Sequence, residues 1–270
     1  MKTDDPVKKA SDLRAKVIAD LRKSGFGAEL AALQIFHNEH FRTTARQVYF
    51  DKILNNQREI DIAADMEKLR HNDQKFICQA VVSVFAEVKK SDRPWVVLRA
   101  KTYENPYNVH LADALIDEFN TPTLRQYTLR ESLAKISANP PGGAWFGHGV
   151  QEAFKSPGDL STWHKAASSV CRAAWNAARP THQDNLGSVW LRHPVVVLEG
   201  KLFSAWSDES FEMQLAEGSR VTILFRETNA VFDRRFLVDL VVMGSLRSYA
   251  SEIKQRLEIA HGQLWKRLNP

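Results

Sequence analysis

The stretch FICQAVVSVFAEVK, residues 76–89, decides the fold class of this chain. Successive side chains of a strand point to opposite faces of its sheet, and here both alternating sets are largely apolar. A strand with that pattern is covered on both faces, as in the middle of an α/β protein. We therefore expect residues 76–89 to form the central strand of a sheet that helices flank.

Helical and strand patterns alternate around this stretch. One helix is expected after a cap at Ser11 and a second from about Ala28 to about His40, because apolar residues recur there at helical spacing. Runs of β-branched and aromatic residues predict three further strands. These are Thr43–Phe50, Arg58–Ala63 and Trp95–Leu98.

The strand predicted at Arg58–Ala63 carries both apolar and acidic residues. Alternation predicts that Ile60 and Ile62 face one side of the sheet and that Glu59, Asp61 and Ala63 face the other. The residues between this strand and the central one are rich in charge. They predict a loop that contains Asp65, Glu67, Lys68 and Asp73.

The second half of the chain begins irregularly and then becomes rich in strands. Helices are expected at Val109–Phe119 and Pro122–Ile136, within an insertion or lid that spans residues 101–160. A long helix over Ser161–Ala178 has apolar residues along one side. The remaining elements are expected to be strands at Pro194–Leu198, Lys201–Trp206, Arg220–Arg226 and Arg235–Val242 and a final helix at Ser245–Arg267.

This layout predicts an α/β fold with a mixed sheet, in one elaborated domain over residues 1–270. Residues 1–40 are the N-terminal helical segment and 41–100 the strands that carry the candidate site. Residues 101–160 are the helical insertion, and 161–270 hold the crossover helix, the β-rich C-terminal extension and the final helix.

Composition excludes several classes of protein. With 270 residues, 44% hydrophobic and 26% charged, the chain is neither disordered nor of low complexity. It has no apolar run long enough for a membrane helix and no apolar segment typical of a secretory signal at its N-terminus. Cys78 and Cys171 lack partners at metal-ligand spacing, so we expect a reduced, cytoplasmic protein. A net charge of +5 permits a nucleic-acid partner.

The chemistry-bearing residues are Asp61, Glu87 and Lys89. Glu87 and Lys89 are two residues apart on the central strand and therefore share a face, where charges are costly unless they are paired or used. Asp61 leaves the same face of a neighbouring strand and can approach Glu87. Two converging carboxylates suit Mg²⁺, and an adjacent lysine can orient or deprotonate a water. The pattern predicts metal-assisted hydrolysis of a phosphodiester. The alternative is a structural ion pair between Asp61 and Lys89, with Glu87 solvated at the strand end.

The segment REIDI, residues 58–62, followed by FAEVKKS, residues 85–91, resembles the PD-(D/E)xK nuclease superfamily, which has the restriction-endonuclease-like fold. The triplet 87–89 matches the (D/E)xK half of the motif, and Asp61 matches the aspartate of the preceding strand. Ile60 stands where the motif usually has proline. The resemblance covers residues 25–98, and the helix from Ser161 corresponds to the one that follows the catalytic strands.

This resemblance implies an enzyme that depends on Mg²⁺ or Mn²⁺ and cleaves DNA or, less often, RNA, in restriction, anti-phage defence or repair. Asp61 and Glu87 would hold the metal, with the Val88 carbonyl as a further donor, and Lys89 would position the attacking water. Many such nucleases act as homodimers, because cutting both strands takes two active sites. We expect no membrane partner.

Three more residues are candidates beside the triad. Glu29 corresponds to a glutamate that many members carry on the first helix and can be a third metal ligand; its alternative is an exposed first-turn glutamate favoured by the helix dipole. Glu59 shares a face with Asp61 and can reach the metal or support its ligands, or it can pair with neighbours of Arg58. Lys165, or His164 beside it, can face the scissile phosphate.

Other motifs are weaker. His37 and His40 lack the spacing and the third ligand of a zinc helix. Residues 145–149, WFGHG, can stack on a base, but we interpret them as a packed loop. No nucleotide-binding glycine motif occurs. The rival function is a catalytically inactive nuclease-like scaffold that binds nucleic acid or a protein partner through its β-rich C-terminal extension.

Overall fold

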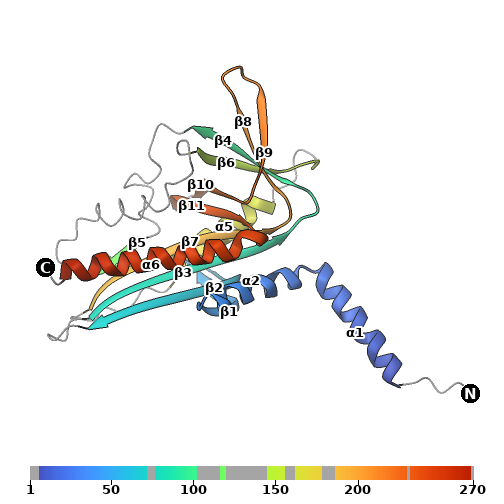
Figure 1. The fold of residues 1–270 in the computed structure, drawn as a ribbon, viewed down its shortest axis with the longest axis horizontal. Helices are drawn as coiled ribbons and strands as arrows, with labels where there is room; N and C mark the ends of the chain where they lie inside the picture. The colour runs from blue at the N-terminus through green and yellow to red at the C-terminus, as the bar shows by residue number, and fades with distance from the viewer. Residues whose placement is uncertain are drawn as a thin grey trace, which may run out of the picture.

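The computed structural model describes residues 6–71, 77–101, 116–119, 145–155, 162–177, 186–229 and 232–268. These residues form a mixed α/β protein whose strands belong to one large mixed sheet (Figure 1). None of the described helices is long and apolar enough to cross a membrane.

The N-terminal half holds two helices and the strands of the candidate site. Its elements are α1 (Pro6–Lys23), α2 (Phe26–Asn38), β1 (Arg42–Asp51), β2 (Asn56–His71), β3 (Ile77–Lys90), β4 (Trp95–Lys101) and β5 (Ile116–Phe119). The second half contributes β6 (Trp145–Glu152), α5 (Thr162–Asn176), β7 (Leu186–Glu199), β8 (Leu202–Ser207), β9 (Met213–Gly218), β10 (Arg220–Asn229), β11 (Phe232–Val242), the short 3₁₀ turn η1 (Met243–Ser245) and α6 (Leu246–Leu268).

The described strands form an eleven-stranded sheet in the order β1-β2-β3-β7-β11-β10-β6-β4-β8-β9, with β5 paired to β7 off this path. β2 and β3 are antiparallel, while β3 and β7 run parallel along the whole of β3, from Ile77 opposite Leu186 to Lys90 opposite Glu199. β3 is thus paired on both sides, as the sequence predicts. A parallel pair needs a crossover, and α5 is the described helix between β3 and β7 in the chain.

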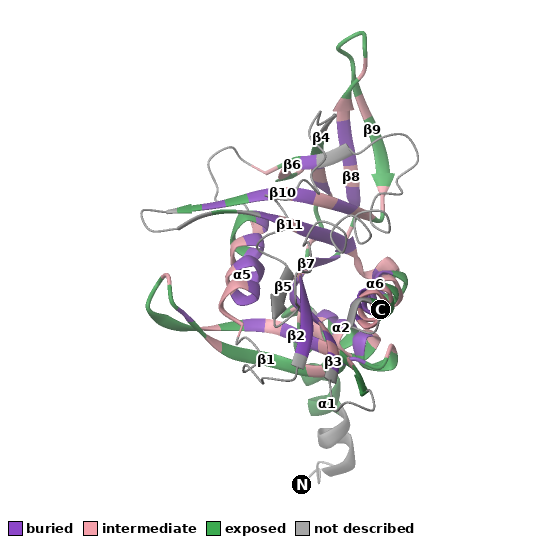
Figure 2. Cartoon of the chain, turned by 90° about the vertical axis from the view of Figure 1, so that its left-hand side faces the viewer, coloured by how far each residue is buried: buried purple, intermediate pink, exposed green. Residues whose placement is uncertain are grey.

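Helices cover the two faces of β3, and α5 lies on the face opposite to α2 and α6 (Figure 2). The even-numbered residues from Cys78 to Val88 pack in one core with α2 and α6. Phe85, on the other face, packs in a second core with residues of α5 such as Trp163 and Val170. This two-sided burial is the physical reason why β3 is apolar on both faces.

β2 changes the face it presents at Asp61. Ile60 packs in the core beside α5, whereas Ile62 packs in the core beside α2 and α6. The prediction that these two isoleucines share a face is therefore wrong. The β1–β2 hairpin is irregular at this point. Arg46 of β1 has a positive φ of 50° and lies between Ala45, which pairs with Ile62, and Gln47, which pairs with Ile60.

The same distortion separates the β1–β2 hairpin from β3. β2 pairs with β3 from Ile62 to His71, while its earlier residues pair with β1. The hairpin then reaches α5, where the Tyr49 hydroxyl donates to the Ser169 carbonyl and the Lys52 N–H donates to the Asn176 side chain. Asp61 consequently lies where two strands of the sheet diverge.

Several predicted elements differ from the structure, because strand pairing between distant segments overrides their local sequence pattern. The prediction of a charged loop is wrong for Asp65, Glu67 and Lys68, because these residues belong to β2. Lys68 forms an ion pair with Glu258 of α6. Asp73 lies outside the described residues. Charged side chains do not prevent a strand when both neighbours supply backbone partners and one face meets solvent.

Residues 101–160 also differ from the predicted helical insertion. Ile116–Phe119 is strand β5 rather than the end of a helix, and the WFGHG segment lies in strand β6 rather than in a packed loop or lid. The remaining residues of the two predicted helices lie outside the described ranges. The sequence prediction misses β9, and it starts the first helix at Ser11 instead of Pro6. β4 pairs with β6 and β8, far from β3 in the sheet order.

The predicted elements with strong periodicity are confirmed. The helices expected at Ser161–Ala178 and Ser245–Arg267 are α5 and α6, and the predicted C-terminal strands correspond to β7, β8, β10 and β11. β7 is longer than predicted, because it starts at Leu186 and pairs with β3 from its first residue.

Candidate functional site

Asp61 occupies the point where β2 leaves β3. Its Oδ2 accepts a hydrogen bond of 2.8 Å from the backbone N–H of Val88. The described pairing of β2 with β3 ends at Ile62, so the carboxylate takes the place of a backbone partner for this N–H. The strand divergence therefore turns Asp61 toward the end of β3.

Glu87 and Lys89 meet Asp61 at this place. The Lys89 Nζ lies 2.5 Å from Glu87 Oε2 and 3.7 Å from Asp61 Oδ2, so one ammonium group contacts both carboxylates. Glu87 is only 8% exposed, while the side chains of Asp61 and Lys89 are 20% and 26% exposed. The structure thus brings together the three residues that the sequence singles out.

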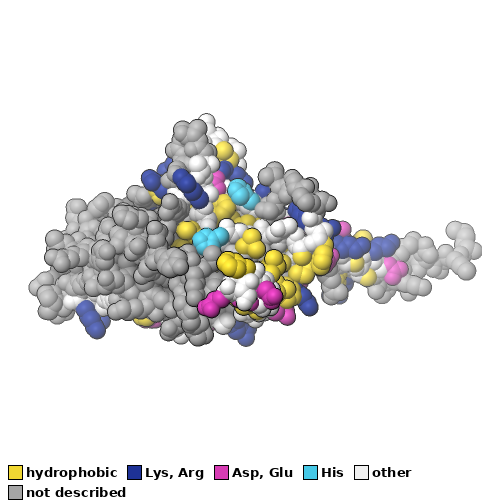
Figure 3. All heavy atoms as spheres, turned by 90° about the horizontal axis from the view of Figure 1, so that it is seen from above, with side chains coloured by type: hydrophobic (Ala, Val, Ile, Leu, Met, Phe, Trp, Pro, Cys, Tyr) yellow, Lys and Arg dark blue, Asp and Glu magenta, His cyan; other side chains and the backbone are white. Residues whose placement is uncertain are grey.

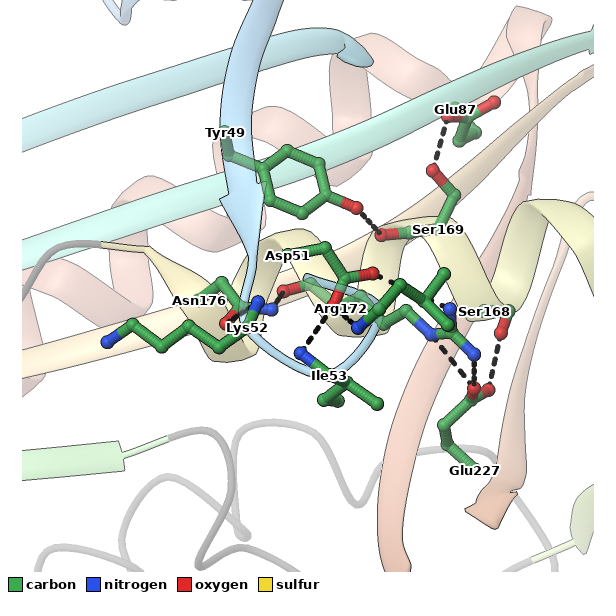
Figure 4. Close-up of polar contacts among 11 residues, drawn as sticks. Tyr49, Asp51, Lys52, Ile53, Glu87, Ser168, Ser169, Arg172, Asn176 and Glu227 are labelled. Atoms are coloured by element: carbon green, nitrogen blue, oxygen red, sulfur yellow. Dashed lines mark hydrogen bonds and ion pairs between the residues drawn. The ribbon is translucent and has the colours of Figure 1, made fainter. Parts of the chain in front are cut away.

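Helix α5 holds the other oxygen of Glu87. The Ser169 hydroxyl donates a hydrogen bond of 2.8 Å to Glu87 Oε1, and both residues are buried. The carbonyl of Ser169 accepts in turn from the Tyr49 hydroxyl of β1 at 3.4 Å (Figure 4). Ser169 is absent from the sequence prediction, because a serine in the middle of an amphipathic helix gives no signal of its contact with a strand.

Burial and neighbouring charge shift the pKa values of this group. Burial raises the pKa of Glu87 above its usual 4.5, and the Asp61 carboxylate raises it further, while the Lys89 ammonium opposes both. Burial alone would lower the pKa of Lys89, but the Glu87 and Asp61 carboxylates outweigh it and raise that pKa above 10.5. Lys89 is therefore held as a cation beside carboxylates that are costly to bury.

An open cavity of about 380 Å³ borders this group. Its walls are formed by residues of the α1–α2 junction, β2 and the end of β3, including Gly25, Glu29, Asp61, Lys89 and Lys90. The carboxylate of Glu29 lies close enough to raise the pKa of Lys89. Glu29 thus faces the same cavity as Asp61 and Lys89, as its placement in the first turn of α2 allows.

Glu29 and Glu59 share a basic partner. Arg46 Nη2 lies 3.3 Å from Glu29 Oε2, and Arg46 Nε lies 4.0 Å from Glu59 Oε1. Glu59 therefore contacts a basic residue of β1. Arg46 is half-exposed, so these contacts are weak.

Lys165 is not part of these contacts. It is exposed on α5, one helical turn before Ser169, and His164 beside it is also exposed. The ring of His164 contacts Phe225 edge-on, with centroids 5.2 Å apart. Lys165 therefore lies on the exposed side of α5, the helix that supports Glu87, and does not contact the triad.

A second charged group anchors the β1–β2 hairpin beneath the site. Arg172 of α5 forms ion pairs with Asp51 at the end of β1 and with Glu227 of β10, and the Ser168 hydroxyl also donates to Glu227 (Figure 4). Asp51 is fully buried and also accepts from the backbone N–H groups of Ile53 and Leu54. Sequence reasoning misses this group, because its members come from three distant segments.

The carboxylate oxygens of Asp61 and Glu87 are ligands of the kind that a small divalent cation such as Mg²⁺ or Mn²⁺ takes. Oxygen atoms of Asp61 and Glu87 converge on a single ammonium, so both can serve one cation at that place. Within the described ranges, no group of three or more His, Cys, Asp or Glu side chains is arranged to hold a metal. Mg²⁺ commonly uses one or two protein carboxylates and keeps several waters.

Comparison with known proteins leaves this geometry as the main guide to function. No protein-family model matches the chain, and no curated protein or solved structure matches it.

Proposed function

We propose that the protein is a divalent-metal-dependent nuclease of the PD-(D/E)xK type, which hydrolyses phosphodiester bonds in DNA. The observation that carries this proposal is the meeting of Asp61 and Glu87 at one Lys89 ammonium, beside an open cavity. Two acids and a lysine on adjoining strands provide a cation site and a positive group for a phosphate in the same space.

The order of elements supports a restriction-endonuclease-like core. α2, β1, β2, β3, α5 and β7 follow one another among the described elements of this part of the chain, apart from the segment with β4 to β6. Asp61 lies on the strand before the one that carries Glu87 and Lys89, and α5 follows them and supports Glu87. This is the arrangement that the resemblance of residues 25–98 implies.

The roles of the residues follow from their contacts. Asp61 and Glu87 would hold Mg²⁺, which supplies Lewis-acid activation of the phosphate and of a water. Lys89, kept cationic by its carboxylate neighbours, orients the attacking water and offsets charge on the phosphate. Ser169 fixes Glu87 Oε1, so that Glu87 Oε2 faces Lys89. Glu29 faces the same cavity and can approach the cation through water.

A nuclease-like scaffold without catalytic activity is the second candidate. The observation that favours it is the close contact of Lys89 with Glu87, which a structural ion pair would also make. In that case the triad stabilises the end of β3, and the protein binds nucleic acid or a protein without cutting it.

Cleavage assays distinguish the two candidates. Purified protein is incubated with single-stranded DNA, duplex DNA and RNA in Mg²⁺, Mn²⁺ or EDTA, beside Lys89→Ala and the matched control Lys201→Ala, an exposed lysine outside the site. We expect metal-dependent cleavage that is lost in Lys89→Ala and kept in Lys201→Ala. Binding without cleavage under every metal condition would support the scaffold, and cleavage that persists in Lys89→Ala would exclude this site.

A further inference from the structure

The β8–β9 hairpin presents large apolar side chains to solvent. Phe211 in its turn is 91% exposed, and Met213 and Leu215 on β9 are 79% and 58% exposed. Met213 and Leu215 are two residues apart on a strand and therefore share a face. β9 ends the strand order, so its outer edge is also unpaired within the described part of the sheet. Such a strand is a docking edge unless something covers it.

The turn that carries Phe211 is held by a set of hydrogen bonds. Asp208 Oδ1 accepts from the backbone N–H groups of Ser210 and Glu212, and its Oδ2 accepts from the Gln214 side chain. The Phe211 N–H donates to the Asp208 carbonyl. Phe211 has a positive φ of 62°, a conformation that costs a bulky residue free energy. The turn thus holds Phe211 outward at a cost in stability.

The charge of this hairpin disfavours a nucleic acid as its partner. Residues 202–218 contain four acidic and no basic residues, namely Asp208, Glu209, Glu212 and Glu217. Glu209, Glu212 and Glu217 are exposed beside the apolar residues. A polyanion would be repelled here, whereas a basic surface with apolar side chains would be attracted.

Helix α1 has the complementary character. Leu13, Val17, Ile18 and Leu21 are 63%, 48%, 39% and 38% exposed, although they recur at the spacing of one helix face. α1 contains six Lys or Arg residues and two Asp residues, and Arg14, Lys16 and Lys23 are exposed near the apolar face. The helix projects from the body of the molecule, well away from the hairpin (Figure 1).

The two surfaces can be followed on one face of the molecule. Seen from above, hydrophobic and acidic side chains lie next to each other in the middle of the described surface, while Lys and Arg side chains accompany hydrophobic ones at the α1 end (Figure 3). Because the two lie apart on one copy, α1 meets a hairpin only on another molecule.

We propose that the protein assembles with itself by docking α1 of one copy on the β8–β9 hairpin of a second copy. The Leu13, Val17 and Leu21 face covers Phe211, Met213 and Leu215, and Lys16 and Lys23 meet Glu212 and Glu217. The interface joins two different surfaces, so two copies exchange contacts reciprocally or the contact continues into a larger closed assembly. The proposal is independent of nuclease activity.

Charge reversal on each surface tests the proposal. One variant carries Lys16→Glu with Lys23→Glu, and the other carries Glu212→Lys with Glu217→Lys. Molar mass is measured by light scattering after size-exclusion chromatography, at low and high salt, with circular dichroism as a check of folding. We expect wild type to have at least twice the mass of one chain at low salt and each variant to have the mass of one chain. An equimolar mixture of the two variants should regain the wild-type mass. The acidic α1 of the first variant then meets the basic hairpin of the second, and the native α1 of the second meets the native hairpin of the first.

A third variant tests the apolar part of the contact. Phe211→Ser with Met213→Ser changes two exposed residues, so it leaves the core intact, and we expect the mass of one chain. A wild-type protein that has this mass at low salt over a hundredfold range of concentration overturns the proposal. So does an assembly whose mass neither charge-reversal variant changes, or variants that do not regain it when mixed.

Discussion

The carboxylate of Asp61 accepts the backbone N–H of Val88 at 2.8 Å, and the strands that carry these residues diverge at this point. The contact places Asp61 beside Glu87 and Lys89, which flank Val88. It also gives Asp61 two separable roles, as a backbone hydrogen-bond acceptor and as a negative charge near a cation.

Asp61→Asn separates these roles. The asparagine side-chain oxygen can still accept from Val88, so we expect the free energy of unfolding to change by less than about 1 kcal/mol. Metal binding requires the charge, so we expect the heat of Mg²⁺ or Mn²⁺ binding in calorimetry to be lost. Asp61→Ala, which also leaves the Val88 N–H without its acceptor, should lose about 1–3 kcal/mol of stability. Unchanged metal binding in Asp61→Asn would count against a site built on Asp61.

Ser169→Ala tests the support of Glu87 by α5. The substitution removes a hydrogen bond that lowers the pKa of Glu87, so this pKa should rise further. We expect the acid limb of the cleavage rate to move to higher pH in Ser169→Ala and to return in Ser169→Thr. Ser168→Ala, whose hydroxyl bonds to Glu227 instead, is the matched control and should leave the pH profile in place. Equal profiles for wild type and Ser169→Ala would show that this serine does not tune Glu87.

Arg172→Met should destabilise the fold. It leaves Asp51 and Glu227, which are 0% and 4% exposed, without their cation. An uncompensated buried charge costs about 3–5 kcal/mol, and we expect a loss of this size in urea unfolding. Arg93→Met, at an exposed position, is the control and should stay within about 0.5 kcal/mol of wild type. A loss for Arg172→Met no larger than that of the control would contradict the anchoring role of this group.

Gly147→Ala should destabilise the middle of the second half of the sheet. A Cβ at Gly147 of β6 would lie 2.6 Å from Val97 Cγ1 and 2.7 Å from Ile223 Cγ1, so the packed neighbours must shift. Overpacking of this kind costs about 1–3 kcal/mol. Gly149→Ala, two residues further along β6, meets nothing within 4 Å and should be nearly neutral. Similar melting temperatures for both variants would disprove the close packing around β6.

His193 should make the protein less stable in acid. Burial, with the nearby Arg256 guanidinium, lowers the pKa of His193 to about 3, although the Asp239 carboxylate opposes this and Arg220 adds to it. The folded state then binds the proton less readily than the unfolded chain, so stability is complete above about pH 6.5 and is lost as pH falls toward 3. Between pH 7 and 4.5 we expect a loss of roughly 1–3 kcal/mol from this residue.

His193→Gln should reduce that loss. The comparison is urea unfolding of wild type and variant at both pH values, because the carboxyl groups away from His193 contribute equally to the two proteins. If the two proteins lose the same free energy of unfolding between pH 7 and 4.5, then His193 does not carry this dependence.

Strong periodicity made part of this protein predictable from its sequence. β3 is apolar on both faces because it is buried on both, and α5 and α6 carry apolar faces that pack on the sheet. The charges of Glu87 and Lys89 at the end of such a strand indicate a site, because they would be costly there without partners. The place of Asp61 on a neighbouring strand predicts its approach to Glu87, although the divergence of β2 from β3 is what turns its carboxylate toward the end of β3.

Long-range contacts decided the rest. The divergence of β2 from β3, the support of Glu87 by Ser169 and the burial of Asp51 and Glu227 around Arg172 each join segments far apart in the chain. β6 and β9 became strands because neighbouring strands supply their backbone partners, although their sequences have weak strand patterns. Local sequence determines which face of a strand or helix is apolar. Only the folded arrangement determines which distant residues meet at that face, because their meeting depends on the sum of many weak contacts.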